Sequence, residues 1–129
     1  MRWLIATLMI APLPALAETV AVPSGQPVRF VEMLQDPNGS EGLTLRFRFL
    51  APQIARETGS VSIDAALGDI DSLCAEFAAI EVANMHPQPE QIVISLMDRL
   101  VDFGATNPDA TQFFEAYRIE DGTCIWEGL

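Results

Sequence analysis

The chain of 129 residues has no lysine, a single histidine, a single tyrosine and only two cysteines. A single histidine limits any Ser-His-Asp or Cys-His catalytic arrangement to one possible base. Without lysine, seven arginines stand against 18 acidic residues, which gives a net charge of −11. So acidic a protein repels nucleic acid, and we predict no nucleic-acid partner. The cysteines form no C-x-x-C pair, so neither a thiolate metal site nor a redox motif is indicated.

The longest apolar run lies at the amino terminus, where a basic start at residues 1–3 precedes an apolar stretch at residues 4–16. This run and the small-residue motif Ala15-Leu16-Ala17 are typical of a secretory signal peptide. The run is too short to span a bilayer stably. We predict a signal peptide at residues 1–17, a single domain at residues 18–129, and a periplasmic or secreted protein with no stable membrane insertion after cleavage.

Cys74 and Cys124 are the only thiols of a chain predicted to reach an oxidising compartment. An even cysteine count in that setting favours a disulfide over two free thiols. A bridge between them closes a loop of about 50 residues, which stabilises a protein by roughly 4 kcal/mol in the loop-entropy model. We therefore predict a Cys74–Cys124 disulfide.

Strict alternation of apolar and polar residues is clearest at residues 43–49. This pattern predicts a half-buried strand. The apolar segment at residues 28–34 predicts a second strand, which Pro37-Asn38-Gly39 is expected to end, and the two strands form a predicted hairpin. One side of the later strand carries Leu43, Leu45, Phe47 and Phe49, and the other carries Thr44, Arg46 and Arg48.

Apolar residues recur at spacings of three and four after Ser62, which predicts a helix that Ser62 caps. The predicted buried stripe comprises Ile63, Leu67, Ile70, Cys74, Phe77 and Ile80. The other side of this helix is acidic and has no basic partner on the same helix. We expect its four carboxylates to face solvent, and they are Asp64, Asp69, Asp71 and Glu76.

The dipeptide Asp121-Gly122 separates two strand-like segments near the carboxyl end and predicts a tight hairpin. Counting outward from this turn sets Tyr117 opposite Trp126. Alternation then places Cys124 and Trp126 on the face that the helix must cover if the disulfide is to form. We expect Trp126 to be buried beneath the helix.

Residues 91–97 are apolar on both sides, which predicts a central strand. Together these segments predict an α+β two-layer domain of order β-β-α-β-β-β. In this fold one long helix is joined by the disulfide to a mostly antiparallel sheet.

Few residues are candidates for chemistry. His86 lies in a predicted surface loop, where a solvated histidine is the favoured interpretation over a catalytic base. Asp69 and Asp71 are two residues apart and diverge on a helix, so we expect no metal site and no cofactor. Arg46 and Arg48 are candidates for binding an anionic group, although pairing with carboxylates across the sheet is the favoured interpretation.

Three segments carry a resemblance to a known family: PEQIVISL at 89–96, QFFEAYRI at 112–119 and DGTCIWE at 121–127. The chain resembles a domain-of-unknown-function family of small exported alphaproteobacterial proteins, loosely over most of its length after the signal peptide. The resemblance implies export, the cysteine pair and the size. It brings no catalytic residue, because that family has no established activity.

These observations predict a non-catalytic binding or accessory module, monomeric and outside the cytoplasm. Loss of Arg2 with the signal peptide leaves six arginines against 18 acidic residues, a net charge of −12. This charge favours a basic envelope protein as partner, with the acidic helix side as its docking surface. The alternative function is a small periplasmic hydrolase that uses His86 with an acidic neighbour.

Overall fold

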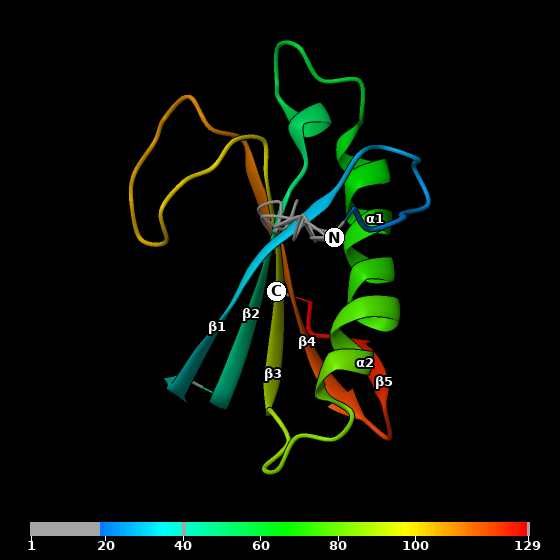
Figure 1. Cartoon of the computed structure of the whole chain (residues 1–129), viewed down its shortest axis with the longest axis vertical. Helices are drawn as coiled ribbons and strands as arrows, with labels where there is room; N and C mark the ends of the chain where they lie inside the picture. The colour runs from blue at the N-terminus through cyan, green and yellow to red at the C-terminus, as the bar shows by residue number, and fades with distance from the viewer. Residues whose placement is uncertain (1–18, 40, 129) are drawn as a thin grey trace, which may run out of the picture.

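The computed structural model describes residues 19–39 and 41–128, and the predicted signal peptide at residues 1–17 lies outside them (Figure 1). Two short non-α segments are the 3₁₀ turn η1 and the π-helical segment η2. In chain order the elements are β1 (Arg29–Gly39), β2 (Gly42–Leu50), η1 (Pro52–Ile54), α1 (Ile63–Leu73), η2 (Cys74–Ala78), α2 (Ala79–Val82), β3 (Gln91–Met97), β4 (Gln112–Glu120) and β5 (Thr123–Trp126).

The five strands form one sheet in the order β1-β2-β3-β4-β5. All neighbours are antiparallel except β2 and β3, which are parallel and are connected through the helix. The helix packs on one face of the sheet (Figure 1). The predicted α+β fold, its element order and the mostly antiparallel sheet are therefore confirmed.

The β4–β5 hairpin has the predicted register, because Tyr117 pairs with Trp126 and Glu120 pairs with Thr123. Both residues of the turn have positive φ, 50° at Asp121 and 76° at Gly122, as a two-residue turn of type I′ requires.

The predicted end of the first strand at Pro37-Asn38-Gly39 is wrong, because β1 continues to Gly39. Pro37 is tolerated there for two reasons. The strand lies at the edge of the sheet, where no outer neighbour needs its missing N–H. A register shift between Asp36 and Gly39 also takes this residue out of regular pairing.

α1, η2 and α2 form one helix of 20 residues. Ser62 caps it as predicted, since its side chain accepts a hydrogen bond from the Ala65 N–H at 3.2 Å. The predicted stripe is wrong at its two ends, because Ile63 and Ile80 are exposed. The wider π turn of η2 changes the phase of the buried face. After Ile70 and Cys74, burial continues at Ala78 and Val82.

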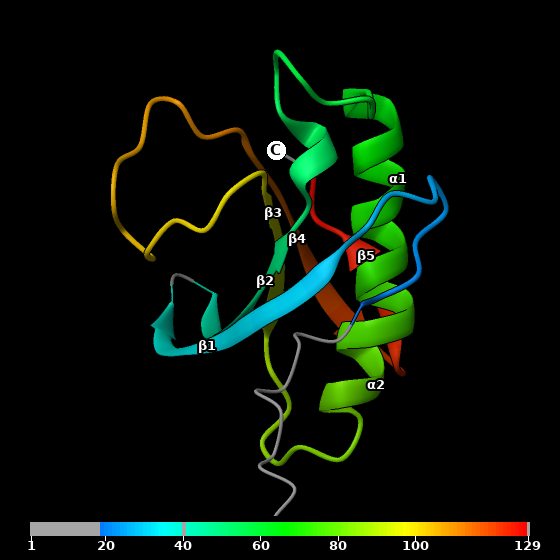
Figure 2. The ribbon, with the colours of Figure 1, turned by 45° about the horizontal axis from the view of Figure 1, so that its top comes forward.

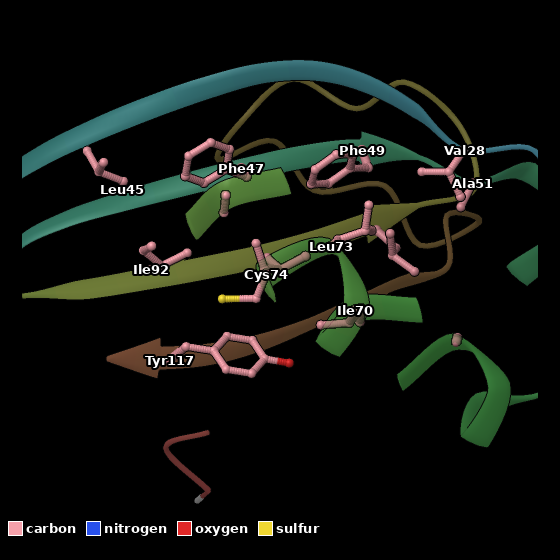
Figure 3. Close-up of a cluster of buried hydrophobic side chains, with 14 of the residues drawn as sticks. Val28, Leu45, Phe47, Phe49, Ala51, Ile70, Leu73, Cys74, Ile92 and Tyr117 are labelled. Atoms are coloured by element: carbon pink, nitrogen blue, oxygen red, sulfur yellow. The ribbon is translucent and has the colours of Figure 1, made fainter. Parts of the chain in front are cut away.

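The core lies between the helix and the sheet (Figure 3). Phe77 of the helix contacts three aromatic rings of β1 and β2, with ring centres 4.9–6.2 Å apart. The sheet contributes alternate apolar residues of its strands, as the period-two pattern predicted. Its fully buried members are Leu45, Phe47, Phe49, Ile92, Ile94 and Leu96.

The predicted disulfide is present between Cys74 and Cys124, whose Cα atoms are 6.2 Å apart. It joins the middle of the helix to β5, the short strand at one edge of the sheet. A disulfide of this kind is typical of an oxidising compartment outside the cytoplasm.

Asp69 is fully buried, so the prediction that it faces solvent is wrong. Residues 19–28 run beside α1 and cover it there (Figures 1 and 2). The Asp69 carboxylate accepts hydrogen bonds from the Ser24 N–H, the Ser24 hydroxyl and the Gln26 amide at 2.9, 2.5 and 2.7 Å. Helical periodicity alone does not reveal a covering segment more than 40 residues away in the sequence.

Trp126 lies on the predicted face but is 59% exposed, so its predicted burial is wrong. The helix covers Tyr117, whose hydroxyl donates to Asp71, and it is joined to β5 at Cys124, but it leaves more than half of the Trp126 side chain exposed. The Trp126 indole instead donates a hydrogen bond to Glu115 at 2.7 Å.

Candidate functional site

The sheet face opposite the helix is partly covered by the loop of residues 98–111 (Figure 2). Two hydrogen bonds join the ends of this loop. The Asp98 N–H donates to the Thr111 carbonyl at 3.0 Å, and the Thr111 N–H donates to the Asp98 carboxylate at 2.9 Å. Burial opposes ionisation of Asp98, but hydrogen bonds from Arg99 and Thr111 outweigh it and lower the pKa of this carboxyl.

A cleft of about 300 Å³ lies between this loop and the open sheet face. We call it the arginine cleft. β2, β3 and β4 supply its floor and the loop supplies one wall. Its principal side chains are Arg46, Arg48, Ser95, Asp102, Phe103 and Phe114.

The alternation of the strand predicts that Arg48 is exposed on the outer face of the sheet. That prediction is wrong, because the side chain is buried. Its guanidinium donates to the Glu32 carboxylate at 2.7 Å and to the Val101 carbonyl at 2.5 Å. The loop that crosses this face encloses the side chain. The favoured interpretation, a carboxylate partner across the sheet, is confirmed for Arg48 but not for Arg46. Arg48 is therefore a structural cation at the base of the cleft.

Arg46 is half-buried and forms no ion pair with any carboxylate of residues 19–39 and 41–128. Its guanidinium carbon lies 5.3 Å from the ring centre of Phe103 and 5.9 Å from that of Phe114. Burial, and secondarily the charge of Arg48, lower the pKa of Arg46. An arginine remains charged at neutral pH, so the cleft holds a cation that lacks a described counter-ion.

The two rings beside Arg46 are each 61% exposed. Strand alternation places Phe114 on the sheet face opposite the disulfide, where an exposed apolar group hints at a partner surface, but no sequence pattern gives a role to Phe103. A lone phenylalanine within the polar loop segment VDFGATNPD is the signal that identifies Phe103 in retrospect. Exposed aromatic rings next to a cation are suited to binding a ligand with an apolar body.

The four predicted acidic residues of the helix do not form one exposed surface. Asp69 is buried, and Asp71 accepts the hydrogen bond of Tyr117. Asp64, Asp71 and Glu76 remain exposed, and none of the three is paired with an arginine in the described part of the chain.

His86 is exposed on the loop between α2 and β3, as predicted. No described side chain forms a hydrogen bond or an ion pair with it. Within residues 19–39 and 41–128, no group of three or more His, Cys, Asp or Glu side chains is placed to hold a metal ion. The fold therefore brings Arg46 and Arg48 together but does not bring His86 to them.

A larger hollow of about 580 Å³ separates residues 54–63 from the start of β4. Its one charged side chain, Arg56, already donates to the Thr111 hydroxyl and to the Ala110 carbonyl. Most of the remaining lining of this hollow is apolar, and its cation is already bonded to the protein itself. The arginine cleft is therefore the better candidate for a specific site.

None of the helices in the described part of the chain has the length and apolar character needed to cross a bilayer.

The fold and the cleft define a small disulfide-bonded α+β protein whose open sheet face holds a pocket of ligand size. Residues 7–129 match a family described as a family of unknown function (DUF6497), and the chain belongs to this family. No curated protein and no solved structure matched the chain.

Proposed function

We propose that this protein is a non-catalytic binding module that works outside the cytoplasm and binds its ligand in the arginine cleft. The observation that carries the proposal is the half-buried Arg46, which lacks a counter-ion among the described residues and lies beside two exposed phenylalanine rings. Stable folding does not require such an arrangement, because exposed aromatic rings and an unpaired, half-buried cation both cost free energy.

Export is part of the same proposal. The signal-peptide pattern of residues 1–17 and the Cys74–Cys124 disulfide both support a periplasmic or secreted location. The implied alphaproteobacterial origin rests on the resemblance alone. A hydrolase that uses His86 would need an acidic neighbour to orient the ring, and the described contacts of His86 offer no support for that alternative.

The acidity of the protein supports a second candidate, a basic envelope protein that docks on the helix. Asp64 and Glu76 are the residues to neutralise, because Asp69 is buried and its replacement would disturb the fold. If such a partner exists, Asp64→Asn with Glu76→Gln should weaken its capture, and added salt should slow its association. Capture that is unchanged by both would exclude the helix as the docking surface.

The main proposal is tested by ligand retention. The purified protein is incubated with a small-molecule extract of the producing cells, washed, denatured and analysed by mass spectrometry. We expect a compound that the wild type retains and that the Phe103→Ala, Phe114→Ala double variant loses. Ile80→Ala is the matched control, because Ile80 is also an exposed apolar residue but lies on the helix. No retained compound, or equal retention by all three proteins, would contradict the proposal.

A further inference from the structure

Arg46 has more hydrogen-bond donors than described partners. A guanidinium carries five N–H donors, and the Arg46 side chain donates only to the Ser95 hydroxyl, at a long 3.4 Å. Three other arginines of the described chain have carboxylate partners: Arg48 has Glu32, Arg99 has Asp98 and Arg118 has Glu120. Of the remaining two, Arg56 donates to the Thr111 hydroxyl and the Ala110 carbonyl, and Arg29 is exposed to solvent. The Arg46 N–H groups that have no described acceptor belong to a side chain that lines a cleft of ligand size.

The rings around Arg46 leave these donors usable. The guanidinium carbon of Arg46 lies over the rings of Phe103 and Phe114, 5.3 and 5.9 Å from their centres. A phenyl ring carries no carboxylate or carbonyl oxygen, so neither ring takes the place of such an acceptor for the guanidinium N–H groups. Two N–H groups side by side match the two oxygens of a carboxylate.

The charges of the cleft favour an anion of low charge. Arg48 adds a second positive charge close to Arg46, but Glu32 neutralises it. Asp102 also lines the cleft and contributes a negative charge. A single uncompensated cation next to a carboxylate suits a monoanion better than a phosphate with two charges.

We propose that the arginine cleft binds a carboxylate carried on an aromatic or apolar body, with Arg46 holding the carboxylate and Phe103 and Phe114 contacting the body. The volume of about 300 Å³ is at the lower end of small-molecule pockets, which fits one ring and one carboxylate. The inference rests on the proposed function, since it names the ligand class of the same site. A free organic acid and the aromatic carboxyl-terminal residue of a peptide share this chemistry.

The test is a titration of the ¹⁵N-labelled protein followed by NMR, with four probes. Benzoate represents a free acid, N-acetylphenylalanine represents a peptide terminus, and N-acetylphenylalanine amide and inorganic phosphate are the controls. We expect both acids to shift the amide signals of Ser95, Phe103 and Phe114. The neutral amide should bind about tenfold more weakly, because it lacks the charge-assisted contact. Whichever acid binds more tightly identifies the source.

Three variants connect the affinity to the cleft. Arg46→Gln should weaken both acids about tenfold, and Arg46→Lys, which keeps the charge but loses the planar fork, should fall between it and the wild type. Asp102→Asn should strengthen binding about twofold by removing a nearby negative charge. Arg118→Gln is the matched control, because Arg118 lies in the same sheet, on β4, is exposed and pairs with Glu120.

The outcomes separate this inference from the proposed function. If the neutral amide binds as tightly as the acids, or if neither Arg46 variant changes affinity, the carboxylate assignment is overturned while binding in the cleft stands. Tighter binding of phosphate than of either acid also overturns it. If no probe shifts these amides, the inference fails, and the retention experiment alone decides whether the cleft binds another ligand.

Discussion

The carboxylate of Asp69 in α1 accepts two hydrogen bonds from Ser24, one from the backbone N–H at 2.9 Å and one from the hydroxyl at 2.5 Å. Because Asp69 is fully buried, this contact joins the N-terminal segment to the helix inside the protein. The buried carboxyl group accepts from neutral donors only, with Gln26 supplying the third hydrogen bond. Residues 19–28 are therefore an integral part of the domain.

Replacement of Asp69 by Asn should destabilise the protein. One side-chain oxygen becomes an NH₂ group that faces donors, so at least one buried hydrogen bond is lost. We expect the free energy of unfolding to fall by about 2 kcal/mol. Asp64→Asn, an exposed substitution on the same helix, should change it by no more than about 0.5 kcal/mol. Equal urea midpoints for the two variants would contradict the role given to Asp69.

Removal of the disulfide should have a larger effect. The Cys74→Ala, Cys124→Ala double variant should lose roughly 2–5 kcal/mol of stability, because its unfolded chain is no longer constrained. Urea unfolding of the wild type with and without reductant provides the control. Reductant should lower the midpoint of the wild type only, and an equal response of the double variant would mean that the bond is not the source of the difference.

Tyr117, the only tyrosine of the chain, should titrate abnormally. Burial, and then the hydrogen bond to Asp71, raise the pKa of its hydroxyl above the usual value of about 10. The folded state therefore keeps a proton that the unfolded state loses. This contribution to stability is complete below pH of about 10 and declines as the pH rises further.

The absorbance of tyrosinate reports this directly, since it comes from one residue. We expect the signal to appear only with alkaline unfolding, whereas the protein in denaturant should titrate near pH 10. Titration of the folded protein at the usual pH would show that the hydroxyl is not buried against Asp71. Tyr117→Phe removes the signal and is the control.

Trp126 should contribute little to stability for so large a side chain. It is 59% exposed, and its indole hydrogen bond goes to Glu115 at the edge of the sheet. We expect Trp126→Ala to cost about 1 kcal/mol, against about 3–5 kcal/mol for Phe47→Ala in the core. Strong quenching of the Trp126 fluorescence by acrylamide in the folded protein should accompany this. A cost equal to that of Phe47→Ala would mean that the ring is covered.

The parts of this fold that follow local rules could be predicted from the sequence. The Asp121-Gly122 turn determines the pairing of β4 with β5, and alternation then places Cys124 on the helix side. Ser62 as a helix cap needs only its position before a periodic segment. The disulfide and the two-layer arrangement follow once these elements are combined, because each has one face that must be buried.

The errors share one physical origin, which is that burial depends on segments distant in sequence. Asp69 is covered by residues 19–28 and Arg48 by the loop after β3, and helix or strand periodicity carries no information about either cover. Trp126 is on the expected face and lines a hollow with Leu67 and Asp71 of the helix, but the helix does not bury it. The arginine cleft escaped prediction for the same reason, since Phe103 comes to Arg46 only when the loop crosses the sheet.

The loop of residues 98–111 is held at its ends by Asp98 and Thr111, while most of its middle is exposed to solvent. Substitutions in the middle therefore change the wall of the cleft without breaking contacts of the core. If the cleft binds a ligand as proposed, ligand preference and folding stability can vary independently in the evolution of this protein. Members of the family could come to bind different ligands by changing a few loop residues on an unaltered, disulfide-bonded scaffold.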